Sequence, residues 1–213
     1  MASIAIIDYG MGNLHSIAKA TEHVAGRLSV RVTSNHDDIL SAGRVVFPGV
    51  GAIRDCMAEL QRTGLDEVVV ETARSKPLLG VCLCMQALLT HSEENDGTDC
   101  LGLIPGEVLR FPPAMEEKGE RLKIPHMGWN RVEQTAPHPM WHGITDGSRF
   151  YFVHSYYASP QRDADVAATT PYGVGFASVV AHDNVFAVQF HPEKSQHAGL
   201  QLLANFVAWN GGS

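Results

Sequence analysis

Short apolar runs alternate with longer stretches of helical period along the first half of the chain. The short runs predict buried strands at residues 3–8, 28–33, 44–47 and 78–81. The longer stretches predict helices at residues 14–25, 53–61 and 65–73, and Asn35 or Asp37 can cap a short helix that runs into Leu40. Strands that alternate with helices indicate a parallel sheet with helices on both faces. Ligands bind such a sheet beyond the carboxyl ends of its strands.

The second half of the chain follows a different pattern. Residues 148–158 are rich in aromatic side chains and alternate in polarity, as do residues 175–180, so we expect antiparallel strands beside the parallel core. Residues 187–190 predict a further strand that ends in His191. Residues 112–121 contain two prolines and mixed charge, which predicts a mobile surface loop.

The chain is expected to close with an amphipathic helix, whose apolar face is predicted to carry Leu200, Leu203, Ala204 and Val207. No repeat or linker divides the sequence. The predicted fold class is therefore α/β, with a single domain over residues 1–213. Its central, mostly parallel sheet is flanked by helices and extended by an antiparallel region. Trp129 and Trp141 are expected to pack rather than bind, from residue type alone.

The most informative stretch is KPLLGVCLCMQ at residues 76–86, where a buried strand meets a helix that starts after Cys82. A tight strand-to-helix turn exposes a nucleophile at the top of a sheet, and the next amide N–H becomes an oxyanion donor. The positive end of the helix favours thiolate over thiol. An inert buried cysteine explains the same motif equally well when the motif is taken alone.

The segment AVQFHPEK at residues 187–194 supplies a second candidate group. Pro192 biases His191 away from helical backbone, and residues two apart in an extended segment face the same way. His191 and Glu193 can therefore act as a base and the carboxylate that orients it, with Cys82 as nucleophile.

Five stretches together resemble a known family. GVCLCMQ at 80–86 and FHPE at 190–193 are similar to the triad-type (class I) glutamine amidotransferases. IIDYGMGNL at 6–14, IPHMGWN at 124–130 and YFVHSY at 151–156 resemble, within that family, the glutaminase subunits of imidazole glycerol phosphate synthase. The resemblance covers essentially the whole chain.

The resemblance implies a set of site residues. Cys82, His191 and Glu193 would form the catalytic triad, and the oxyanion hole would combine the Leu83 amide with the Val50–Gly51 peptide. The residues implied to contact the substrate glutamine are Gly49, Gln86, His154, Ser155 and Tyr156. Core packing and strand pairing remain the alternative for Gln86 and the last three.

One position departs from the family pattern, because Cys84 stands where the elbow normally has glycine. Residues two apart on a helix do not face each other, so we expect no disulfide between Cys82 and Cys84. Cys84 is expected to be a buried, normal thiol in a turn that has relaxed or gained room from a smaller neighbour.

The function implied by the resemblance is hydrolysis of L-glutamine to L-glutamate and ammonia. The ammonia would pass to a cyclase barrel subunit in a heterodimer, which makes imidazole glycerol phosphate and the purine precursor AICAR in histidine biosynthesis. Two alternatives stay open: a glutaminase subunit of a different synthase, against which residues 125–130 and 151–156 count, and a catalytically silent regulatory subunit, against which the intact triad counts.

Composition removes several other functions. The net charge of −7, with no basic patch, argues against nucleic-acid binding. The first residues lack a basic targeting region, and no apolar run approaches about 18 residues, so we expect a soluble, cytoplasmic chain without a membrane partner.

Cysteine and histidine usage supports the same interpretation. The spacing of the four cysteines suggests no disulfide framework, which favours a reducing compartment. Among eleven histidines only His138 and His142 have helical i, i+4 spacing, and Pro139 lies between them. We therefore expect no metal and no cofactor.

Overall fold

A computed structural model of the chain describes residues 3–117 and 119–212. Its main sheet has a parallel half in the spatial order β2-β1-β3-β4-β16. These strands are β1 (Ser3–Ile7), β2 (Ser29–Thr33), β3 (Arg44–Gly49), β4 (Leu78–Cys82) and β16 (Val185–Val188). Fully buried strands at the centre, β3, β4 and β16, match the continuous apolar runs of the sequence.

The other half of the sheet is mainly antiparallel and begins at β16, which is parallel to β4 and antiparallel to β15. The sheet continues from β15 through β13 and β7 to β5 and β6, and β14 pairs with β15 and β11. The strands are β5 (His91–Ser92), β6 (Thr98–Asp99), β7 (Gly106–Arg110), β11 (Glu133–Gln134), β13 (Tyr156–Pro160), β14 (Val166–Tyr172) and β15 (Val174–His182).

Two smaller sheets lie outside this one. One pairs β10 (His126–Arg131) with β12 (Arg149–His154), in antiparallel register. The other pairs β8 (Glu116–Glu117) with β9 (Glu120–Arg121). Alternating burial along β10 and β12 leaves one face of their sheet in the core and the other exposed.

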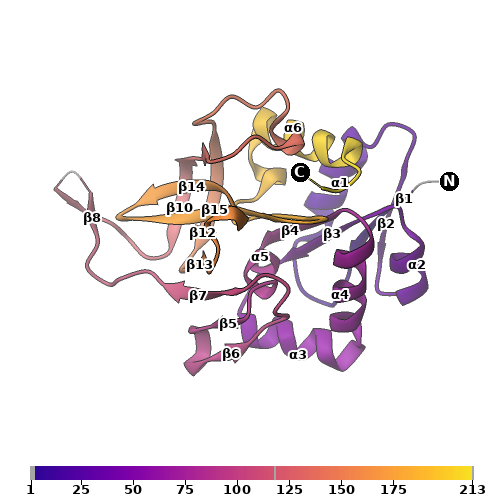
Figure 1. The fold of residues 1–213 in the computed structure, drawn as a ribbon, viewed down its shortest axis with the longest axis horizontal. Coiled ribbons are helices and arrows are strands. Elements are labelled where there is room, and N and C mark those ends of the chain that lie inside the picture. Colours follow the sequence, from indigo (N-terminus) through magenta and orange to yellow (C-terminus); the bar gives the residue numbers. More distant parts are fainter. Residues whose placement is uncertain (1–2, 118, 213) are drawn as a thin grey trace.

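Helices cover both faces of the parallel half, as Figure 1 shows. Helices α1 (Leu14–Val24) and α6 (Gln196–Ala208) pack on one face, and α2 (His36–Ser41), α3 (Ile53–Thr63) and α4 (Leu65–Ser75) lie on the other. The residues of β1 alternate between the two apolar clusters, with Ile4 and Ile6 in one and Ala5 and Ile7 in the other.

Short helical segments complete the chain. Helix α5 (Leu83–Ala87) follows β4 directly, and the loops of the described residues contain four 3₁₀ turns. These are η1 (Glu94–Asp96), η2 (Pro139–Trp141), η3 (Asp163–Asp165) and η4 (Pro192–Lys194). Among residues 3–117 and 119–212, no helix is both long enough and apolar enough to cross a membrane.

The α/β class and the antiparallel region are confirmed, and Asn35 is the residue that caps α2. Three expectations were wrong. Trp129 is 42% exposed because it lies on the outer face of β10, whereas Trp141 is buried as expected. Residues 112–121 include two short strands where a loop was expected. Helix α6 is apolar on several sides, so the spacing of its apolar residues did not identify the side that packs against the core. The buried side carries Gly199, Leu202, Leu203 and Phe206.

A close approach of three residues joins the loop after β1 to β3 and α5. A Cβ atom added to Gly49 would overlap the hydroxyl oxygen of Tyr9 and the Sγ of Cys84, which lie 3.5 Å apart. Both side chains are buried. The absence of a side chain at Gly49 therefore provides the room that Cys84 occupies, and the smaller neighbour expected from the sequence is Gly49.

We predict that Gly49→Ala lowers the free energy of unfolding by about 1–3 kcal/mol, because it overfills a closely packed site. Chemical denaturation would measure the loss. Gly175→Ala is the matched control, since an added Cβ there meets nothing within 4 Å. Cys84→Gly should restore part of the stability in the Gly49→Ala background. Equal stability of Gly49→Ala and Gly175→Ala would contradict the packing argument.

Candidate active site

Cys82 lies at a sharp turn between β4 and α5. Its backbone has φ 55° and ψ −111°, a positive φ that non-glycine residues rarely adopt. The parallel register places Gly49 beside Cys82 and Val188 beside Val81, so the elbow lies where the carboxyl ends of three strands meet. The predicted elbow is thus present, at the edge of the sheet where α/β proteins bind ligands.

His191 and Glu193 meet beside this elbow through a turn. Strand β16 ends at Val188, and Glu193 lies in the 3₁₀ turn η4, so the expectations of a strand that ends in His191 and of an extended Glu193 were wrong. The expected extended backbone of His191 is confirmed, with φ −98° and ψ 101°. The contact between the two residues is nevertheless present: His191 Nδ1 donates a hydrogen bond of 2.9 Å to Glu193 Oε1. Pro192 at the start of the turn makes the tight geometry accessible.

The backbone of His191 is held from both sides. Its N–H donates to the carbonyl of Tyr151 on β12, at 2.9 Å. Ser195 Oγ donates to the carbonyl of His191 at 2.6 Å and accepts from the N–H of Tyr151. These bonds tie the turn to β12 and fix the position of the imidazole ring.

Burial and neighbouring groups act in opposite directions on the imidazole of His191. Burial lowers the pKa, but the nearby thiol of Cys82 and the hydrogen bond and charge of Glu193 outweigh it and raise the pKa of His191 to about 10. The ring is therefore protonated at neutral pH. Its Nε2 atom is buried and forms no hydrogen bond of ordinary geometry within the described chain.

A cavity of about 290 Å³ opens beside Cys82. It brings together the residues predicted from the sequence at positions Val50, Gly51, Cys82, Leu83, Gln86, His154, Ser155, Tyr156 and His191. Glu193 lies behind His191 and outside the lining, and Gly49 does not line the cavity, because its Cα faces Tyr9 and Cys84.

Three lining residues were missed by sequence reasoning: Glu94, Pro125 and Val153. Glu94 Oε2 accepts a hydrogen bond from the N–H of Ile53, at the start of α3. The sequence places Glu94 in an acidic, glycine-containing loop, and nothing in that pattern points to a cavity. Pro125 and Val153 stand within the quoted motifs at 124–130 and 151–156, but as apolar residues they were assigned no role there.

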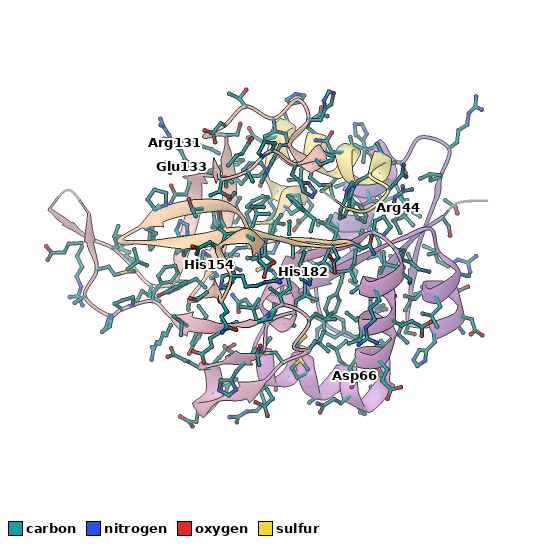
Figure 2. All side chains as sticks on the ribbon, viewed as in Figure 1. Arg44, Asp66, Arg131, Glu133, His154 and His182 are labelled. Carbon is teal, nitrogen blue, oxygen red and sulfur yellow. The ribbon has the colours of Figure 1, made fainter. Side chains whose placement is uncertain are left out.

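Several polar residues at and near the cavity are hydrogen-bonded to one another. Gln86 Nε2 donates to the Tyr156 carbonyl and to Gln189 Oε1. His154 Nδ1 donates to the same carbonyl at 2.8 Å, and burial lowers the pKa of His154 to about 3, so this ring is neutral. His154 lies among the side chains at the middle of the molecule, whereas Arg131 lies at its edge (Figure 2).

Cys84 is near Cys82 in sequence but does not line the cavity. It is fully buried, and burial raises the pKa of its thiol well above the ordinary value, with a further contribution from Cys56. The expectation of a buried thiol is confirmed, but the expectation of a normal one was wrong. All four cysteines are free.

A cysteine on a strand-to-helix elbow, facing a cavity beside a carboxylate-bound histidine, can attack an amide carbonyl and form a thioester. The fold and this site together are those of an α/β enzyme with a cysteine and a histidine beside a ligand-sized cavity. The chain belongs to the family of class-I glutamine amidotransferases, whose family model matches residues 5–209.

Two curated relatives are called imidazole glycerol phosphate synthase subunit HisH. The protein from Methylococcus capsulatus is 64% identical, over 98% of this chain and 97% of its own length. The protein from Pseudomonas putida is 59% identical, over 99% of both. A solved structure described as PurLQS from Thermotoga maritima shares the fold, with a TM-score of 0.73 at 17% identity over 98% of this chain and 99% of that one.

We predict that Cys82→Ala lowers the pKa of His191 from about 10, because the charge of Cys82 raises it. Glu193→Gln should also lower it. Imidazole NMR titration measures each value, and His138, whose pKa burial lowers to about 4, should not move. An unchanged His191 titration in Cys82→Ala would contradict the contact.

The sign of the linked effect on stability follows from the same value. Because the pKa of His191 in the folded chain lies above its ordinary 6.5, protonation stabilises the fold fully below about pH 6.5. This contribution is lost as the pH rises through about 10.

Proposed function

We propose that residues 1–213 form the glutaminase domain of an imidazole glycerol phosphate synthase. The chain would hydrolyse L-glutamine to L-glutamate and pass the ammonia to a cyclase barrel subunit. The observation that carries this proposal is the elbow cysteine beside the His191–Glu193 pair, in a chain whose relatives are named as subunits of that synthase. A cytoplasmic location fits the free thiols.

The proposed reaction proceeds in two steps. The Cys82 thiolate attacks the carbon of the glutamine side-chain amide, and His191 gives its proton to the departing nitrogen, which leaves as ammonia. His191 then takes a proton from water, which cleaves the glutamyl thioester and releases glutamate. Glu193 holds Nδ1 of the ring, so that Nε2 is the atom that exchanges the proton.

Two backbone N–H groups are proposed to stabilise the oxyanion. The Leu83 amide is the first of α5, and the N–H groups of a first helical turn have no partner within the helix. Val50 and Gly51 line the cavity, and Gly51 has φ 101°, where a side chain would be strained. Glycine at this position lets the peptide turn toward the developing charge.

The cavity also has groups suited to the amino-acid end of glutamine. Glu94 is the one carboxylate among the residues found to line it, and we propose that it binds the substrate ammonium. Gln86 and residues 154–156 lie on the same cavity and are proposed to contact the substrate. Gly49 would contribute indirectly, through the position of the strand end beside Cys82.

The outer face of the β10–β12 sheet is proposed to bind the partner subunit. Met127 and Trp129 are 62% and 42% exposed, and they pair across the sheet with Val153 and Tyr151. Val153 lines the cavity, so this apolar face borders the site where ammonia would form. Exposed aromatic and methionine side chains are typical of the central part of protein interfaces.

We predict that Cys82→Ala abolishes glutamine hydrolysis by the two-subunit complex and leaves cyclisation with added ammonium salt intact, because Cys82 serves ammonia production alone. A glutamate-release assay and a cyclisation assay on the same preparation would measure both. Wild-type glutamate release by Cys82→Ala would refute the proposed nucleophile.

We predict that Trp129→Ala weakens binding of the partner at least about tenfold, since a central aromatic side chain often contributes more than 1.4 kcal/mol. Isothermal titration calorimetry would measure the dissociation constant. Val32→Ala is the matched control, because Val32 is 41% exposed on β2, far from β10 in Figure 1. Equal losses for the two variants would place the interface elsewhere.

A further inference from the structure

Gln189 is a polar residue in surroundings where apolar residues are the rule. It lies between the end of β16 and His191, is fully buried, and has the buried neighbours Val188 and Phe190. Its backbone N–H donates to the carbonyl of Ser178 on β15. Burying a primary amide costs free energy unless its atoms are hydrogen-bonded, so the partners of the side chain indicate what it does.

The orientation of the Gln189 amide follows from its neighbours. The carbonyl of Tyr156 can only accept, so the Gln86 atom 2.9 Å away is the nitrogen. The same Gln86 nitrogen lies 2.8 Å from the Gln189 amide, which must present its oxygen there. The nitrogen of Gln189 then points the other way, and it lies 3.9 Å from Sγ of Cys82.

We propose that Gln189 is a positioning residue for the nucleophile, whose Nε2–H donates to Sγ of Cys82 and favours its thiolate form. The inference rests on the proposed function, in which Cys82 is the nucleophile. Gln86 would contribute by holding Gln189 in the donating orientation.

A donor that cannot ionise complements His191. His191 gives away its proton when ammonia leaves, whereas the amide of Gln189 can donate throughout the cycle. Hydrogen bonds to an ionised atom are stronger than bonds to a neutral one. The Gln189 bond should therefore be weak toward the thioester sulfur and stronger toward the thiolate that leaves when water cleaves the thioester.

Few titratable groups compete for this sulfur. His191 faces Cys82 from the η4 turn, with Glu193 behind it. Cys84 lies on the same elbow, and Tyr9 and Cys56 lie beyond it. His154, Tyr156 and Glu94 also line the cavity. Gln189 is the one uncharged side chain with a hydrogen bond to Sγ among the described residues.

Two variants separate a donor from a packing residue. Gln189→Glu keeps the shape and an oxygen for Gln86, but an ionised carboxylate presents no hydrogen to sulfur. Gln189→Met replaces the amide by an apolar end group and retains a side chain of similar length. Ser178→Ala is the matched control, because Ser178 Oγ is buried without a partner in the described chain, and the backbone contact with Gln189 is retained.

The experiment measures the rate at which iodoacetamide alkylates Cys82 as a function of pH, with peptide mass spectrometry to identify the site. The pH of half-maximal rate should rise in Gln189→Met, and rise further in Gln189→Glu. The kcat/KM for glutamine in the two-subunit complex should fall about tenfold or more, as for the loss of a hydrogen bond to a charged group. Ser178→Ala should match the wild type in both measurements.

Circular dichroism would establish that each variant is folded before its alkylation profile and kcat/KM are compared with the wild type. Loss of activity in both Gln189 variants with a wild-type alkylation profile would mean that Gln189 only packs, and would overturn the inference. Glutamine hydrolysis by Cys82→Ala would refute the proposed function instead, and the alkylation profiles would still decide whether Gln189 contacts the sulfur.

Discussion

Cys82 adopts a positive φ of 55°, a conformation that costs a non-glycine residue about 1–3 kcal/mol and persists only where the surroundings enforce it. The surroundings here are β3 and β16, which hold β4 on both sides through parallel pairing along its fully buried length. The strain turns the backbone sharply at the strand end, so that Sγ faces the cavity and α5 starts immediately behind it. The position of every other group in the site is defined relative to this turn.

The histidines near the cavity illustrate how neighbours decide charge. Burial lowers the pKa of His154 to about 3 and of His126 to about 4, and the two rings share a hydrogen bond of 2.9 Å as neutral groups. His191 is buried as well, yet its pKa rises to about 10, because Cys82 and Glu193 face it. One wall of the cavity is therefore neutral and polar, while the other carries a proton that can be transferred.

The β10–β12 sheet connects the cavity with the molecular surface. Its inner face carries His126 and His154, which continue the polar network toward Tyr156 and Gln86. Its outer face carries Met127 and Trp129. Because adjacent residues of a strand point to opposite faces, a shift of β10 would move His126 together with Met127 and Trp129. A partner that docks on the outer face would thus border the cavity, which Val153 lines from that face.

The strands of the parallel half, most of the helices and the elbow could be predicted from the sequence, because apolar runs and helical periods are local properties. The Cys82 turn and the His191–Glu193 pair could also be predicted from short sequence motifs, although the pair meets through a 3₁₀ turn rather than an extended strand. The side of α6 that packs could not be predicted, since Leu, Ala and Phe occupy several of its sides.

Other features depend on contacts between segments far apart in the chain, and only the tertiary structure decided them. The room for Cys84 comes from Gly49 on another strand, Glu94 reaches the cavity from a loop, and Trp129 is exposed because one face of its small sheet has no covering layer. The amide of Gln189 points at Cys82 because Gln86 and Tyr156 leave it one orientation. Local pattern determines which backbone forms, whereas the partner of a buried polar atom is determined by the packing of distant segments.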